Sequence, residues 1–207
     1  MSRPSSQFAL PLPPAQEGDP ASIVIGSANL PVVEALREPE RWPFRTAILR
    51  GEPRSGKSLL GRWFAHAGLG ETIDPADAME ETALFHRWNR AQEEGTALLL
   101  IPEKAPWEIA LPDLRSRLGA ALALEIGQPD DDMMRDLIVS HAARRGLMLG
   151  EDALTHVVPR MTRSFAAAER FVAVLDRLAL ERQARPTRNL CRDALETLYG
   201  PDQGRLL

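Results

Sequence analysis

Cysteine is almost missing from this chain, since Cys191 is the only one among 207 residues. One thiol cannot form an internal disulfide or a thiolate metal site, and so low a cysteine content fits a reducing compartment. No apolar run approaches the roughly 18 to 20 residues of a membrane span. The N-terminus has no apolar stretch of the kind found in secretory signals. We therefore expect a cytoplasmic protein without a membrane partner.

An excess of positive charge is also missing, because 25 Lys and Arg residues stand against 29 Asp and Glu residues, which gives a formal net charge of −4 and a sequence pI of about 5.6. A protein that binds nucleic acid non-specifically needs a basic face to displace counterions from the phosphates. The acidic balance therefore argues against such a binder. Hydrophobic residues make up 44% of the chain, which is enough for a packed core.

The pattern of apolar residues changes near residue 128. Before it, short apolar runs alternate with helical periodicity, which predicts an α/β domain. After it, only helical patterns follow. We expect a flexible arm over 1–21, an α/β domain over 22–128 and a small helical lid over 129–207. The expected strands include 46–50, 96–101 and 120–126, and the expected lid helices cover 130–145, 151–158, 163–183 and 187–199.

A phosphate-binding loop follows the apolar run at 46–50. Gly51, Gly56, Lys57 and Ser58 meet the spacing G-x-x-x-x-G-K-[ST] in full. The glycines let several backbone N–H groups point at one anion, the lysine neutralises the β- and γ-phosphates, and the serine hydroxyl can hold Mg²⁺. The helix that follows adds the positive end of its dipole. We expect ADP or ATP with Mg²⁺ at the residues Gly51, Arg54, Ser55, Gly56, Lys57, Ser58 and Leu59.

The acid that hydrolysis would need is less clear. Phosphoryl transfer requires a carboxylate for Mg²⁺ and a residue that positions water. Asp74 is the best metal candidate, and a turn or helix-cap role is the alternative. The strand end at Ile101, Pro102 and Glu103 offers no Asn or Thr to contact a γ-phosphate. The sequence therefore predicts nucleotide binding and does not predict hydrolysis by this chain alone.

Four segments carry a family resemblance. The run Ile25-Gly26-Ser27-Ala28-Asn29, then Trp42-Pro43, then the phosphate-binding loop resembles the opening of the DnaA-type initiator ATPases. The string Leu111-Pro112-Asp113-Leu114-Arg115-Ser116-Arg117-Leu118 resembles box VII of that family, whose last arginine reaches the nucleotide of a neighbouring subunit. The resemblance implies an AAA+ α/β fold, Ile25 at the nucleotide and Arg117 as a catalytic residue acting in trans.

Two further features resemble one branch, the regulatory inactivators of DnaA (Hda or HdaA). The chain has no helix-turn-helix segment after the lid, so the resemblance implies no direct sequence-specific DNA binding. The residues Gln7, Phe8, Leu10, Pro11 and Leu12 resemble the motif that docks on the replicative sliding clamp, the β subunit of DNA polymerase III. A short extended anchor with a proline fills an apolar groove at little ordering cost. The implied partners are DnaA and the clamp, and a homodimer is compatible with them.

The chain also departs from the family. Between Ala67 and Met79 there is too little room for the family's complete edge strands, so we expect a parallel sheet trimmed to about four strands. The arginine expected early in the long lid helix falls on Ala166. Both departures weaken the case for intrinsic ATPase activity. The alternatives are a stand-alone P-loop ATPase or small-molecule kinase, and an adaptor that binds DnaA without triggering hydrolysis.

Overall fold

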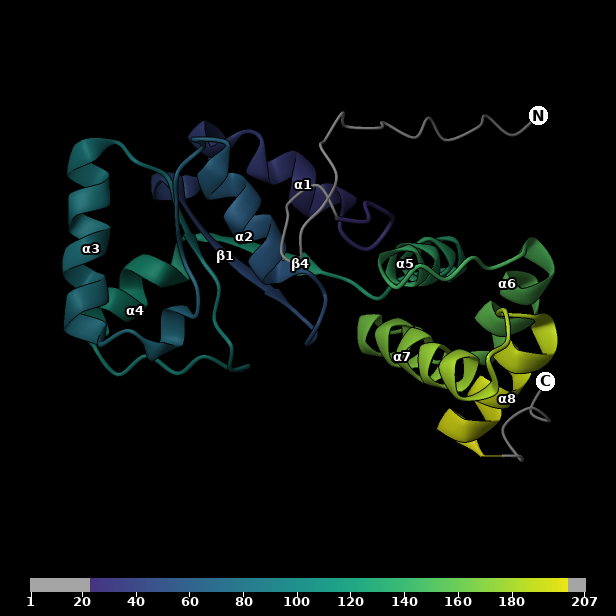
Figure 1. Cartoon of the computed structure of the whole chain (residues 1–207). Helices are drawn as coiled ribbons and strands as arrows, with labels where there is room; N and C mark the ends of the chain where they lie inside the picture. Colours follow the sequence, from purple (N-terminus) through teal and green to yellow (C-terminus); the bar gives the residue numbers. More distant parts are fainter. Residues whose placement is uncertain (1–22, 201–207) are drawn as a thin grey trace.

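A four-stranded parallel sheet forms the centre of the computed structural model, which describes residues 23–200 (Figure 1). The strand order is β2 (Glu71–Ile73), β3 (Leu98–Leu100), β1 (Thr46–Gly51) and β4 (Leu122–Ile126). In the register, Ile48 of β1 pairs with Leu100 on one side and Ala123 on the other. The predicted parallel sheet of about four strands is confirmed.

Strand β3 is shorter than the predicted strand at 96–101. The amide of Thr96 donates to the carbonyl of Ala91, so the chain is still closing the preceding helix there. Strand β2 lies in the segment that appeared too short for complete edge strands, and it is only three residues long.

Helices cover both faces of the sheet, and successive residues of β1 point to opposite faces. Ala47 and Leu49 pack in one apolar cluster with α1 (Leu30–Leu36) and α2 (Lys57–His66). Ile48 packs in a second cluster with α3 (Glu81–Glu94) and α4 (Pro112–Gly119). Because both faces of the sheet are buried, the strand sequences are continuous apolar runs. Short 3₁₀ turns lie at Pro39–Arg41, Pro43–Arg45, Ala76–Ala78 and Val158–Arg160.

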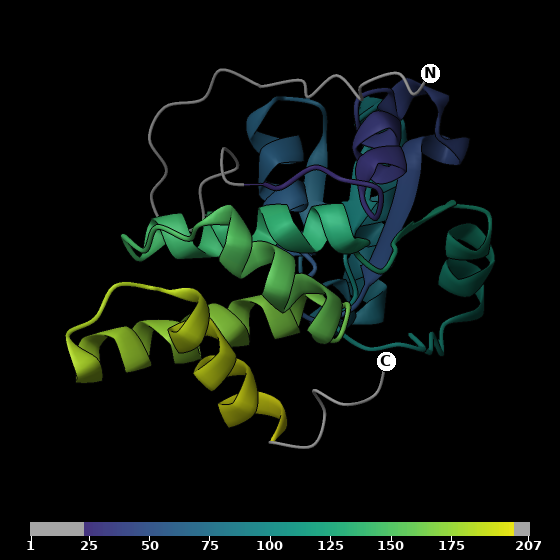
Figure 2. The same cartoon turned by 90° about the vertical axis from the view of Figure 1, so that its right-hand side faces the viewer.

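Four helices follow β4 in the described residues: α5 (Asp131–Arg144), α6 (Glu151–Val157), α7 (Phe165–Arg182) and α8 (Arg188–Tyr199). Polar side chains cap three of them. The side chain of Asp130 accepts from the Met133 amide at 2.8 Å, and Ser164 and Thr187 cap α7 and α8 in the same way. Figure 2 shows α5 and α7 side by side with α8 against α7.

The helical part shares a core with the sheet. Phe171, Val172 and Leu175 of α7 are completely buried and belong to the same cluster as Leu49 and Phe64. The change from alternating elements to helices alone falls between β4 and α5, close to the position expected from the sequence. One face of the sheet is therefore continuous with the core of the helical part.

Candidate functional site

The phosphate-binding loop joins the carboxyl end of β1 to the start of α2. Gly56 is the residue before the helix and has φ of 90°, in the left-handed region that glycine adopts without strain. Arg54 also has positive φ, at 67°, and is exposed. The fold therefore places Gly51 through Leu59 in the strand–loop–helix context that the motif requires.

Lys57 reaches back over this loop. Its Nζ donates to the carbonyl oxygens of Gly51 at 2.7 Å and Glu52 at 3.0 Å. Partial burial lowers the pKa of Lys57 below 10.5, and the negative charge of Asp74 opposes that shift. The ammonium group thus lies inside the loop, in the position needed for charge neutralisation of a bound phosphate.

Several hydrogen-bonding groups of the loop have no hydrogen-bond partner among the described residues. Ser55 is 4% exposed, and its Oγ is buried without a partner. Within residues 23–200, the amides of Lys57, Ser58 and Leu59 donate to no acceptor, as is usual in the first turn of a helix. Orphan amides at the positive end of α2, beside a buried hydroxyl, suit an anion with several oxygens. The residues present therefore fit a nucleotide phosphate.

Asp74 follows β2 directly and is exposed at the same end of the sheet as the loop. Its negative charge raises the pKa of Lys57, against the lowering by burial. The turn role is taken instead by Asp77, whose carboxylate accepts from the amides of Glu103 and Lys104, both at 2.9 Å. Among the described residues, no group of three or more His, Cys, Asp or Glu side chains could hold a metal ion by itself. Mg²⁺ would have to be shared with the phosphates, Ser58 and Asp74.

The segment around Ile25 packs against the large core cluster and is held by Asn29. The Asn29 side chain accepts from the amide of Gly26 at 2.9 Å and donates to the carbonyl of Val24 at 2.8 Å. A Cβ on Gly26 would lie 2.8 Å from the Met133 side chain of α5, so only glycine allows this close approach. This segment therefore contacts the start of the helical part.

The long helix α7 brings a carboxylate to the phosphate-binding loop. Arg54 pairs with Glu169, with 3.4 Å between Nη1 and Oε1. Ala166 lies one turn earlier on α7, where the resemblance called for an arginine. The flanking arginines are engaged elsewhere: Arg163 donates to both carboxylate oxygens of Asp131 at 2.9 and 3.2 Å, and Arg170 donates to the carbonyl of Ala166 at 3.3 Å. Sequence reasoning missed Glu169, because nothing local to it signals a loop contact so distant in the chain.

Arg117 lies in the last turn of α4 and is exposed. Its guanidinium carbon is 5.1 Å from the ring centroid of Phe85 and 4.5 Å from that of Trp88. In the described part of the chain it forms no hydrogen bond or ion pair, so the pairing with Asp113 that would make it a purely structural residue is not formed. Arg115 differs, because it donates to the carbonyls of Ile109 at 2.8 Å and Ala110 at 3.3 Å.

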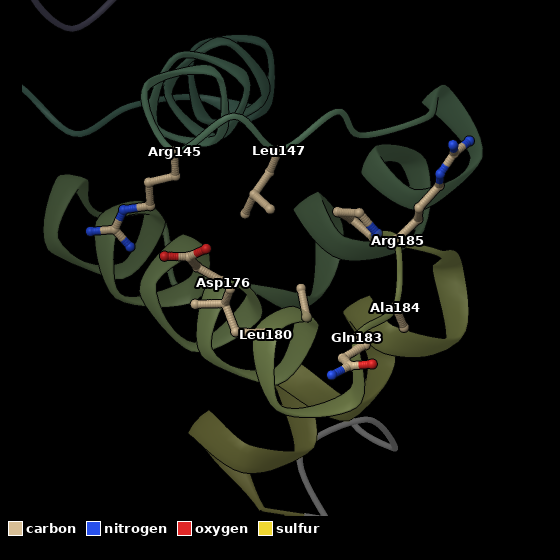
Figure 3. A pocket seen from close by; sticks show the side chains of 9 residues that line it. Arg145, Leu147, Asp176, Leu180, Gln183, Ala184 and Arg185 are labelled. Atoms are coloured by element: carbon tan, nitrogen blue, oxygen red, sulfur yellow. The ribbon is translucent and has the colours of Figure 1, made fainter.

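A separate groove of about 380 Å³ lies on the helical part, away from the loop (Figure 3). It is lined by Arg145 and Leu147 after α5, and by Asp176 and Leu180 of α7. These side chains combine apolar surface with charges of both signs, and none of the phosphate-binding residues is among those lining it. The groups that suit a phosphate lie at the loop instead.

Two expectations concern other parts of the chain. The clamp-binding residues Gln7, Phe8, Leu10, Pro11 and Leu12 lie outside the described residues. Within the described residues, no helix has the length and apolar character needed to cross a membrane.

No family model matches the chain. It is 26% identical over 186 residues to the chromosomal replication initiator protein DnaA of Agrobacterium fabrum. That alignment covers 86% of this chain and 37% of the relative, so the chain spans little more than a third of that protein's length.

Solved structures share the fold. Domain III of the Thermotoga maritima replication initiation protein DnaA matches with a TM-score of 0.68 at 14% identity, covering 92% of this chain and all of that one. A RuvB variant of Thermotoga maritima, T158V, matches with a TM-score of 0.61 at 17% identity, covering 87% and 72% of the two chains. A replication initiator DnaA bound to AMPPCP and single-stranded DNA matches with a TM-score of 0.58 at 16% identity, covering 86% and 69%. This chain therefore has the AAA+ α/β fold of DnaA domain III and RuvB, and its sequence is similar to DnaA.

Proposed function

We propose that this protein is a DnaA-related regulator of replication initiation, of the Hda type, which binds a nucleotide and stimulates hydrolysis of ATP bound to DnaA. The similarity to DnaA over most of the chain supports DnaA as the partner, because related AAA+ surfaces can pair with one another. The DnaA-like structure bound to AMPPCP supports an adenine nucleotide as the ligand of the loop.

The observation that carries the proposal is the exposure of Arg117 and its lack of an oxygen acceptor in the described residues. It is exposed at the end of a helix and has no acceptor within residues 23–200. An arginine supplied in trans stabilises the charge of the phosphoryl-transfer transition state and can be worth about 10³ to 10⁵ in rate. The site in this chain has Ala166 where the family resemblance implies an arginine. On this proposal, the chain therefore hydrolyses ATP bound at its own site slowly. The nucleotide would then have a structural role at the loop.

The proposal includes the sliding clamp as a tether. The motif Gln7 to Leu12 would dock on the β subunit of DNA polymerase III and bring the AAA+ part to DnaA on DNA. The sequence motif supports this step.

The test is single-turnover hydrolysis of ATP bound to DnaA, with and without this protein and DNA-loaded clamp. We expect stimulation by the wild type and by Arg115→Ala, and loss of most stimulation with Arg117→Ala. Arg115 is the matched control because it lies on the same helix and donates to backbone carbonyls instead. DnaA binding without any stimulation would replace the proposal with the non-hydrolytic adaptor.

One observation favours a second candidate, a stand-alone P-loop ATPase. Asp74 directly follows β2 at the same end of the sheet as the loop, where a Mg²⁺ ligand beside the phosphates would lie. This candidate predicts rapid ATP turnover by the purified protein alone. The first proposal predicts slow turnover without DnaA.

A further inference from the structure

Two aromatic rings on α3 face the guanidinium of Arg117. Phe85 and Trp88 are three residues apart, so they project from the same side of the helix. The guanidinium carbon lies 5.1 Å from one ring centroid and 4.5 Å from the other, both within cation–π range. In Figure 1, α3 and α4 lie together at the edge of the α/β part far from the helical lid.

Trp88 is fixed from the sheet. It is 4% exposed, and its indole Nε1 donates to the hydroxyl of Thr46 at 3.1 Å. That hydroxyl in turn donates to the carbonyl of Phe44 at 2.9 Å. The ring therefore has a defined orientation relative to the first residue of β1.

The start of α4 is fixed from the start of α3. The Glu81 carboxylate accepts from the amides of Ala110 at 2.8 Å and Leu111 at 2.6 Å. Both the helix that carries Arg117 and the helix that carries the rings are thus held before any partner arrives.

We propose that Phe85 and Trp88 are positioning residues that hold the Arg117 side chain extended for a phosphate on the partner protein; this rests on the proposed function. An arginine that is free to rotate loses much side-chain entropy when it engages a phosphate. A ring contact restricts the guanidinium without occupying its N–H groups with an oxygen acceptor. The five donors of Arg117 stay available for a bidentate contact to phosphate oxygens.

The test uses Phe85, because it is only half-buried and its replacement disturbs the core less than that of Trp88. In single-turnover hydrolysis of DnaA-bound ATP with loaded clamp, Phe85→Leu should lower the maximal rate constant about two- to fivefold, from the usual strength of an exposed cation–π contact. The protein concentration that gives half the maximal rate should stay unchanged. Phe85→Tyr, which keeps the ring, should restore the rate, and Phe85→Met provides a second ring-free variant if the leucine variant fails to fold.

Two double variants distinguish the positioning role of Phe85 from the proposed function of Arg117. Phe85→Leu combined with Arg117→Ala should be no slower than Arg117→Ala alone, whereas Phe85→Leu combined with Arg115→Ala should be as slow as Phe85→Leu. A wild-type rate with Phe85→Leu, while Arg117→Ala is inactive, would overturn the positioning role and leave the proposed function standing. Full activity of Arg117→Ala would overturn both.

Discussion

Arg54 of the phosphate-binding loop and Glu169 of α7 form an ion pair, with 3.4 Å between Nη1 and Oε1. The pair joins the loop to the helical part of the chain. It also puts a negative charge next to a loop whose other features favour an anion. A phosphate and Glu169 therefore compete for the same positive surroundings.

We predict that Glu169→Gln increases affinity for ADP. The carboxylate repels the phosphates and holds Arg54, and both effects end in the variant. Because the two side chains are 69% and 32% exposed, solvent screens the pair, and such pairs are worth about 0 to 1 kcal/mol. We expect an increase of up to about fivefold by calorimetry, with a smaller difference at high salt. Glu181→Gln, at the far end of α7, is the control, and weaker ADP binding by Glu169→Gln would contradict the competition.

A second prediction concerns Asp130, which caps α5 beside the phosphate-binding part of the chain. A hydrogen bond from Ser27 and the amide of Met133 lower the pKa of Asp130 below 3.8. The folded protein therefore binds this proton less readily than the unfolded chain, and the ionised group contributes stability above pH 3.8 that is lost as the pH falls through the lowered pKa. Loss of a cap costs about 0.5 to 2 kcal/mol.

Urea unfolding should accordingly show that Asp130→Ala lowers the free energy of unfolding by that amount at pH 7. Asp130→Asn keeps a capping oxygen and should lose less. The difference between the wild type and Asp130→Asn should shrink as the pH is lowered below 3.8. A difference that stays constant with pH would show that the charge of Asp130 contributes nothing.

The sequence predicted what depends on neighbouring residues and missed what depends on packing between distant ones. The loop from Gly51 to Ser58 is contiguous, so its spacing was enough to place it between a strand and a helix. The buried runs of β1 and β3 were visible because helices cover both faces of the sheet. The Arg54–Glu169 pair was not visible, because the two residues are far apart in the sequence and meet only through the packing of α7 beside the loop.

Arg117 shows the same limit. Asp113 lies four residues before Arg117 on the same helix, and this spacing allows an exposed ion pair that is worth only about 0.3 to 0.5 kcal/mol. The structure replaces that pair with two rings from α3, which sequence spacing on α4 cannot reveal. The role of Arg117 at a partner's nucleotide stays a prediction.

The third prediction concerns clamp binding by the N-terminal motif, which lies outside the described residues. Changing Leu10 and Pro11 together to Ala should remove the apolar anchor and abolish binding to the sliding clamp in surface plasmon resonance. Nucleotide affinity and thermal unfolding should stay as in the wild type. Changing Ser5 and Ser6 to Ala, just before the motif, is the matched control. Unchanged clamp affinity in the Leu10 and Pro11 variant would remove the tether from the proposal.

The last prediction separates the role of Lys57 from that of Asp74. Lys57→Ala should weaken ADP binding by tenfold or more, on the order of the 1.4 kcal/mol or greater expected from losing a charged hydrogen bond to phosphate. Asp74→Asn removes a negative charge near Lys57, so ADP binding without Mg²⁺ should stay the same or tighten. If Asp74 ligates Mg²⁺, the same variant should lose the extra affinity that Mg²⁺ gives the wild type. Calorimetry with and without Mg²⁺ distinguishes these outcomes, and Asp113→Asn on α4 is the control for a change of charge alone.

ATP turnover by the isolated protein completes the test: slow turnover in all variants supports a nucleotide used structurally, whereas fast turnover lost in both Lys57→Ala and Asp74→Asn would establish the stand-alone ATPase instead.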